Sequence, residues 1–276
     1  MHRKQTQNWR KSTPSKLLGF KWSSMSSIDA QPSSITPRPG SHALGVALTS
    51  LLLLLGVAFA AAWATRELPL FSLLPPGGQV PDIRPEQRLD LHRTFFTIWA
   101  ALLLVAPALC LFAFRRSSRR ASEWWLAFWT AALVAFLVHF YWAVVVIYGN
   151  DWSRILRTPR VSAPILDTVF ALWWCVDVLL AWILRSEALW VRVQRVGVHV
   201  LAFVLFFMGA AREGELPASR ALGWALLVAV ALCVAIRWIK IARARDTAAA
   251  SPARPARRAT SARPRPRSQD TSKKPR

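Results

Sequence analysis

Residues 43–65 read ALGVALTSLLLLLGVAFAAAWAT, an apolar run of 23 residues that contains no charged side chain. A helix needs about 20 apolar residues to cross the hydrocarbon core of a bilayer. The run follows 42 other residues and is longer than the apolar segment of a cleaved signal peptide. It therefore predicts a transmembrane helix that stays in the protein.

Five more apolar runs follow, separated by segments that hold most of the charged residues. The chain of 276 residues is 54% hydrophobic, yet its formal net charge is +22, because apolar and basic residues are segregated along it. This segregation is typical of membrane proteins with several spans. The sequence thus predicts an all-α, polytopic integral membrane protein with six transmembrane helices within residues 43–240. The other five spans are expected at 94–114, 124–150, 161–184, 196–211 and 221–238.

The last two spans are short for a bilayer, since the run 196–211 has only 16 residues. Arginines at the span ends could extend their guanidinium groups to the lipid headgroups and so lengthen each span. A re-entrant or interfacial hairpin over 196–238 is the alternative, and the absence of proline inside either run favours two separate spans. The arginines expected to snorkel in this way are Arg195, Arg212, Arg220 and Arg237.

Lysine and arginine are distributed unequally between the two sides of the predicted bundle. Seven lie in residues 1–42, four at 115–120, three at 185–195 and thirteen from 237 onward, which places 27 of the 36 on one side. Positive residues accumulate on the cytoplasmic side of membrane proteins. We therefore predict that both termini are cytoplasmic. The alanine- and arginine-rich composition favours the plasma (inner) membrane of a bacterium.

Both tails are basic and lack an apolar period. Residues 241–276 are rich in arginine, proline and alanine, and residues 1–42 are rich in serine, threonine and proline. Such segments cannot bury enough apolar surface to fold, so both are expected to be disordered, with Met25 as an alternative start of the first. Their charge suits anionic lipid headgroups. Nucleic acid is not indicated, because the C-terminal tail has no aromatic residues among its basic ones.

The chain holds 15 tryptophans, many of them near the expected ends of the spans. Indole rings favour the headgroup region, so this tryptophan-rich chain is expected to form an aromatic belt at each membrane surface. Trp173 and Trp174 lie nearer to the middle of a span, and a belt does not explain them.

No standard catalytic or cofactor motif occurs in the sequence, and its three cysteines are single residues in three different spans. No nucleophile stands beside a base in a recognisable pattern, and no spacing of residues indicates a metal site. The sequence therefore predicts neither catalytic residues nor metal ligands.

An acid in the middle of an apolar run is the most unusual feature of the sequence. Asp177 lies within LWWCVDVLLAW, residues 172–182. Asp177 and His199 are both expected about 4–7 Å to the cytoplasmic side of the midplane, where they could meet and carry a proton or hold a cation. Alternatively, Asp177 is protonated, bonds a neighbour such as the Trp174 indole, and serves helix packing. Asp167, near the other end of the same span, is expected to face water. The polar cluster expected within the membrane comprises Asp177, His199, Thr49, Ser50 and Thr130.

Two histidines within the spans, His139 and His199, are the candidates for binding a cofactor. Their expected heights differ by about 12 Å, which argues against one haem held between them. We therefore expect no cofactor, with a single-histidine haem, a quinone or another pigment as the alternative.

Three functions compete on this pattern. The favoured hypothesis is a non-enzymatic accessory, scaffold or assembly subunit of a membrane complex, because few polar groups lie within the spans and the basic tails suit a protein partner. The first alternative is a small proton- or cation-coupled transporter that uses Asp177 and His199, although no repeat relates the first three spans to the last three. The second alternative is a haem-, quinone- or pigment-binding membrane protein.

Overall fold

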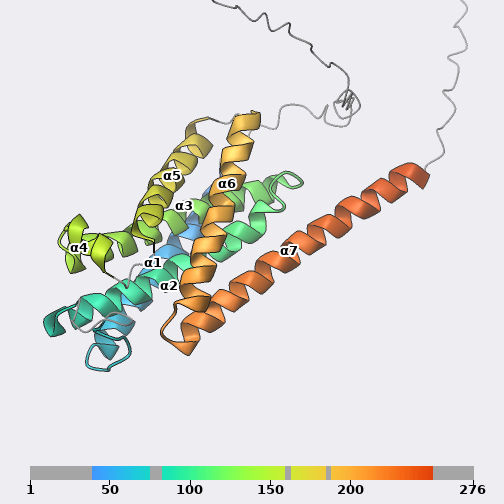
Figure 1. The fold of residues 1–276 in the computed structure, drawn as a ribbon. Coiled ribbons are helices and arrows are strands. Elements are labelled where there is room, and N and C mark those ends of the chain that lie inside the picture. The colour runs from blue at the N-terminus through green and yellow to red at the C-terminus, as the bar shows by residue number, and fades with distance from the viewer. Residues whose placement is uncertain (1–38, 75–82, 159–162, 185–187, 251–276) are drawn as a thin grey trace, which may run out of the picture.

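The structure is a computed structural model that describes residues 39–74, 83–158, 163–184 and 188–250. All regular secondary structure in these ranges is helical, which confirms the all-α prediction. Six helices are long and apolar enough to cross a membrane, the architecture expected of a multi-pass membrane protein. They are α1 (Ser41–Thr65), α2 (Arg88–Phe112), α3 (Arg119–Tyr141), α5 (Pro164–Ile183), α6 (Leu189–Phe207) and α7 (Pro217–Ala250) (Figure 1).

Four short segments accompany the six spans. The 3-10 turn η2 (Pro85–Gln87) leads into α2, and the short helix α4 (Trp152–Arg157) lies between α3 and α5. Two π-helical segments, η3 (Trp142–Ile147) and η4 (Met208–Arg212), continue α3 and α6. Because α3 and α6 run in the same direction through the bundle, both π-helical segments lie at the same end of it.

The last two spans are longer than the sequence indicated. The α6 helix begins about two turns before the expected start and, with η4, forms a span of 24 residues, while the span of α7 has 31. Both are therefore long enough to cross a bilayer without a re-entrant hairpin. The expectation that Arg195 snorkels is wrong, because the earlier start of α6 carries its side chain into the bundle, where it is fully buried. Arg212 and Arg220, in contrast, remain exposed.

A central hairpin of α2 and α3 organises the bundle. The α1 helix packs across both of them, α5 contacts α3 and α6, α6 also reaches α2, and α7 packs on α2 and η4. Among the six spans, α2 is the most buried and α7 the least. In the most apolar stretch of each helix, 44% of α2 and 11% of α7 is buried within the bundle. Small side chains let α1 approach the hairpin closely. Its buried face consists of Ala43, Ala47, Leu51, Ala58 and Ala62.

The α7 helix runs parallel to α2 and extends past the other helices at its C-terminal end (Figure 1). Near its start, the Trp99 indole donates to the Ser219 hydroxyl at 2.8 Å. Gly223 lies so close to η4 that a Cβ there would come within 2.6 Å of the Ala211 nitrogen, so a side chain would push the two elements apart. Further along, Lys240 Nζ lies 5.6 Å from the centre of the Phe114 ring.

The two ends of the bundle differ in charge. We call the end formed by the turn 113–118 and the C-terminal part of α7 the basic end. The opposite end, with the described parts of the connections at 66–74, 148–158 and 213–216, is the loop end. The basic end carries Arg115, Arg116, Arg119, Arg120, Arg237, Lys240, Arg243 and Arg245.

A tight turn joins η3 to α4 at the loop end. Gly149 and Asn150 both have positive φ, 62° and 61°, which glycine adopts freely and asparagine tolerates. Asp151 then caps α4, because its Oδ1 accepts from the Arg154 nitrogen at 3.1 Å and from the Ser153 hydroxyl at 2.7 Å. These hydrogen bonds hold the pKa of the Asp151 carboxyl below its ordinary value. The turn lays α4 over the bundle and buries Ile155.

Candidate functional site

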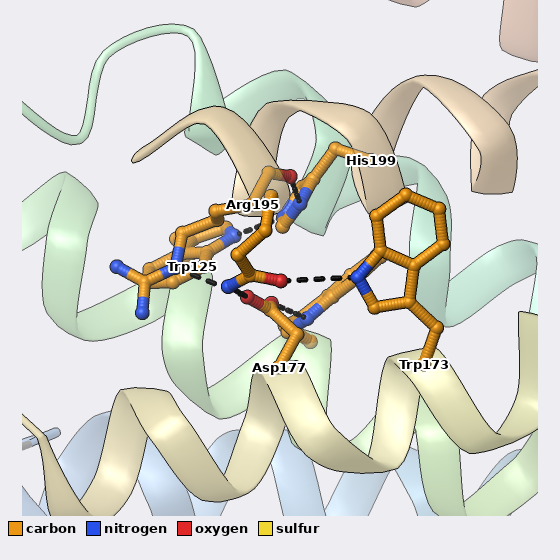
Figure 2. Close-up of polar contacts among 7 residues, drawn as sticks. Trp125, Trp173, Asp177, Arg195 and His199 are labelled. Carbon is orange, nitrogen blue, oxygen red and sulfur yellow. Dashed lines mark hydrogen bonds and ion pairs between the residues drawn. The ribbon is translucent and has the colours of Figure 1, made fainter. Parts of the chain in front are cut away.

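Three helices meet around a buried polar cluster in the half of the bundle near the basic end. The α5 helix contributes Asp177, and α6 contributes Arg195 and His199, which are four residues apart and so share one helix face. The α3 helix contributes Trp125 and Trp129. In Figure 2 the side chains of Asp177, Arg195 and His199 lie together in the space between these helices.

Both carboxylate oxygens of Asp177 are engaged by side chains of the chain itself. Oδ1 lies 3.3 Å from Arg195 Nε and accepts from Gln194 Nε2 at 2.7 Å, and Oδ2 accepts from the Trp129 indole at 2.9 Å. The side chains of Asp177 and Arg195 are each 0% exposed. A buried charge is tolerated when it is paired and its remaining lone pairs are hydrogen-bonded, and Asp177 meets both conditions.

Gln194 extends the network back to α5. Its Oε1 accepts from the Trp173 indole at 3.1 Å, while its Nε2 donates to Asp177. The amide thus links two positions on α5 that are one turn apart, and it explains why a tryptophan stands at 173. Gln194 therefore holds α6 in register with α5.

His199 is a neutral imidazole held at both nitrogens. Its Nδ1 lies 2.7 Å from the Arg195 carbonyl oxygen, which can only accept, so Nδ1 carries the proton. Its Nε2 then accepts from the Trp125 indole at 2.8 Å. The ring is stacked between Phe112 and Trp129, with each ring centre 3.9 Å away. In this arrangement neither nitrogen is available as a ligand to haem iron.

Two guanidinium groups also lie against the ring of Trp125. Arg195 Cζ and Arg115 Cζ each lie 5.3 Å from the centre of its ring. Such cation–π contacts are strongest where water is excluded. Trp125 therefore joins the intramembrane cluster to the turn at the basic end, where Arg115 is buried.

Asp177 and His199, predicted as direct partners, belong to one cluster but do not bond each other. Arg195 lies between them, since its side chain meets Asp177 and its carbonyl oxygen meets His199. Trp129 contacts both, through its indole nitrogen and its ring face. The alternative partner of Asp177, the Trp174 indole, has no hydrogen-bond partner in the structure, and Trp129 takes that role instead.

The hydroxyl residues expected at the same depth lie elsewhere. Thr130 accepts from the Trp182 indole at 3.0 Å and so joins α3 to α5 at a separate point. Thr49 and Ser50 line a shallow hollow on α1 with His42 and Gly45. The structure keeps them apart from Asp177 because α1 packs on α2 and α3 rather than on α5 or α6.

His139 lies in the other half of the bundle. Its Nδ1 is 2.9 Å from the Thr94 carbonyl oxygen on α2. Trp125, the partner of His199, is 14 residues before His139 on the same helix, a rise of about 21 Å. The two histidines therefore lie at different heights and belong to different surroundings.

Sequence reasoning missed four members of the cluster: Trp125, Trp129, Gln194 and Arg195. Arg195 was assigned to the headgroup region because it borders an uncharged run. The spacing of Arg195 and His199 by four residues was the available signal, since it places both on the face that an intramembrane acid on the preceding helix would meet. No comparable signal marks Trp129 among so many tryptophans.

Within the described ranges, no three His, Cys, Asp or Glu side chains come close enough to hold a metal ion. Comparison with models of protein families, with curated proteins and with solved structures found no match to this chain. Its function therefore has to be inferred from the chemistry of the site and the surfaces of the bundle.

Proposed function

We propose that the protein is a non-catalytic accessory, scaffold or assembly subunit of a membrane complex. The observation that carries the proposal is that the acid and the imidazole of the intramembrane cluster are both fully engaged within the bundle. Both oxygens of Asp177 and both nitrogens of His199 are engaged by groups of the same bundle. A transport acid or a ligand to a cofactor needs an open position for a mobile proton, ion or group. A cluster without such an open position is suited to fixing the packing of α3, α5 and α6.

The α7 helix is the element best suited to a partner. Its 34 residues rise about 51 Å, well beyond the hydrocarbon thickness of about 30 Å. Its own bundle covers little of its surface. Small residues recur every fourth position along it, and such a stripe lets a second helix approach closely. These residues are Ala221 and Ala225, both exposed, and Ala229, which is half-buried.

Site-specific photo-crosslinking in native membranes tests this role. With a benzoyl-phenylalanine in place of Ala225, the full-length chain is expected to give one discrete protein adduct. The matched position is Ala60 on α1, an exposed alanine that is expected to give none. Electrophoresis of the tagged chain before and after illumination gives the measurement. Absence of a protein adduct at Ala225, with the purified chain remaining alone and monodisperse, would contradict the accessory role.

We place both tails in the cytoplasm of a bacterium, with the basic end against anionic lipid headgroups of the inner membrane. The positive residues of the turn 113–118 and of the C-terminal part of α7 support this orientation. Two exposed serines at opposite ends offer a matched test in a variant in which the three native cysteines are replaced by alanine. A membrane-impermeant maleimide is expected to label Ser153→Cys in cells with a permeable outer membrane, and Ser117→Cys only after the inner membrane is opened. The reverse pattern would overturn the orientation.

The alternative of a small proton- or cation-coupled transporter is favoured by one observation, the meeting of Asp177, Arg195 and His199 within the membrane. The two functions differ in what happens when both charges are removed together. A transporter should lose its activity in an Asp177→Ala/Arg195→Met variant that still folds. A scaffold should keep its crosslink from Ala225 in the same variant.

A further inference from the structure

A second hollow lies between the helices near the loop end, away from the polar cluster. It has a volume of about 320 Å³ and is bounded by α2, α3, α5 and α6 together with η3 and η4. Pockets that bind small molecules have volumes of about 300–1,000 Å³ and mostly apolar walls. The walls here are largely aromatic, and include Phe95, Trp99, Phe136, Phe140, Phe170 and Phe206.

Both π-helical segments of the chain border this cavity. Ala143, Val144 and Ile147 come from η3, and Met208 and Gly209 come from η4. A π-turn is rare and widens the helix locally, and such turns recur at functional sites. Two of them, from helices far apart in the sequence, widen two walls of the same cavity.

The charge of the cavity walls runs against that of the whole chain. The protein has 36 Lys and Arg against 14 Asp and Glu, yet the lining residues that belong to the described ranges include Asp167 and Glu213 and no Lys or Arg. Asp167, which was expected to face water, is only partly exposed here. Its carboxylate and that of Glu213 are close enough to interact electrostatically.

The other polar groups on the cavity wall include a hydrogen-bond acceptor that a ligand can reach. His139 donates from Nδ1 to the Thr94 carbonyl oxygen, so in the neutral ring Nε2 is an acceptor. Acceptors, carboxylates and aromatic faces together match a positively charged donor, since cations are attracted to aromatic faces as well as to carboxylates. An ammonium group would also stabilise the ionised form of the Asp167 carboxyl.

We propose that this cavity binds a hydrophobic amine, with its ammonium group at Asp167 and its apolar body between the aromatic walls. A phospholipid with an amine headgroup is a poorer match, because its phosphate would meet a wall on which the described residues include two acids and no Lys or Arg. This site is separate from the accessory role inferred from the polar cluster and from α7, so either can be tested without the other.

The test is binding of 4-phenylbutylamine to the full-length chain in nanodiscs of zwitterionic lipid, measured by isothermal titration calorimetry. The neutral 4-phenylbutanol has a body of the same shape and is expected to bind at least about tenfold more weakly, because it makes no charge-assisted hydrogen bond. Asp167→Asn is expected to weaken binding of the amine about tenfold and to leave that of the alcohol unchanged. Asp246→Asn, an exposed acid on α7, serves as the matched control and should change neither.

A second pair of variants keeps the test decisive if Asp167→Asn fails to fold. Gly209 borders the cavity and has open space around the position of its missing Cβ, as has Gly56 on α1, which lies elsewhere. Gly209→Phe is expected to weaken binding of both the amine and the alcohol, whereas Gly56→Phe should weaken neither. Equal affinity for amine and alcohol, or amine binding that survives both Asp167→Asn and Gly209→Phe, would overturn the proposal.

Discussion

Replacing Asp177 with alanine is expected to lower the free energy of unfolding by about 3–5 kcal/mol. The substitution removes the carboxylate that faces the buried Arg195 guanidinium and deprives Gln194 and Trp129 of their acceptor. The Arg195 and Trp129 side chains cannot reach water without opening the bundle, because both are fully buried between α3, α5 and α6. Thermal unfolding of the full-length, detergent-solubilised chain, followed by tryptophan fluorescence, measures the effect.

Asp246→Ala is the matched control, because the same side chain is removed from an exposed position on α7. It is expected to change the unfolding transition by no more than about 0.5 kcal/mol. The double variant Asp177→Ala/Arg195→Met removes both charges and should be less destabilised than Asp177→Ala alone, since no buried charge is left uncompensated. Identical transitions for Asp177→Ala and Asp246→Ala would show that the ion pair does not stabilise the bundle.

Replacing Trp129 with leucine should destabilise the chain by about 3–5 kcal/mol, the range for truncating a large buried aromatic residue. The Trp129 side chain is 0% exposed, donates to Asp177 Oδ2 at 2.9 Å, and stacks on His199 with ring centres 3.9 Å apart. Its ring centre also lies 4.5 Å from that of Trp174. The loss of stability therefore has three sources: a hydrogen bond is removed, ring contacts are removed, and a cavity is left within the bundle.

Trp129→Phe separates these contributions, because it keeps an aromatic ring but removes the indole donor. We expect it to be clearly less destabilised than Trp129→Leu. Trp224→Leu is the matched control, since Trp224 is 54% exposed on α7. The measurement is again thermal unfolding of the full-length chain. If Trp129→Leu and Trp224→Leu unfold at the same temperature, Trp129 does not have the central role in packing that its contacts indicate.

The six spans could be predicted from sequence because apolar length is a local property. The hydrocarbon thickness sets how many uncharged residues a helix needs, and each run supplies them by itself. The start of α6 could not be found in this way. Residues 189–195 contain two arginines, and a scale that assigns an unfavourable energy to each charge ends the span before them. The acid on α5 and the Trp125 ring both contact Arg195 and make its burial inside the bundle acceptable.

The position of the polar cluster was predictable, but its pairing was not. Counting residues from the span ends places Asp177 and His199 at one depth, yet depth does not say which face a side chain occupies or which helix is its neighbour. Thr49 and Ser50 illustrate this, since they share the expected depth but lie on α1, which packs mainly on α2 and α3. Contacts between helices far apart in the sequence decide the pairing, and a single sequence does not contain them.

The ion pair between Asp177 and Arg195 bears on how the chain enters the membrane during its synthesis. An arginine at the centre of a helix opposes insertion by about 2.5–3.5 kcal/mol when that helix enters alone. The α5 helix is made first and carries the acid, and only a short connection separates it from α6. A nascent α6 that meets α5 can neutralise Arg195 before it reaches the lipid. We therefore expect α5 and α6 to enter the membrane together as one hairpin, because α5 supplies the acid that neutralises Arg195 of α6.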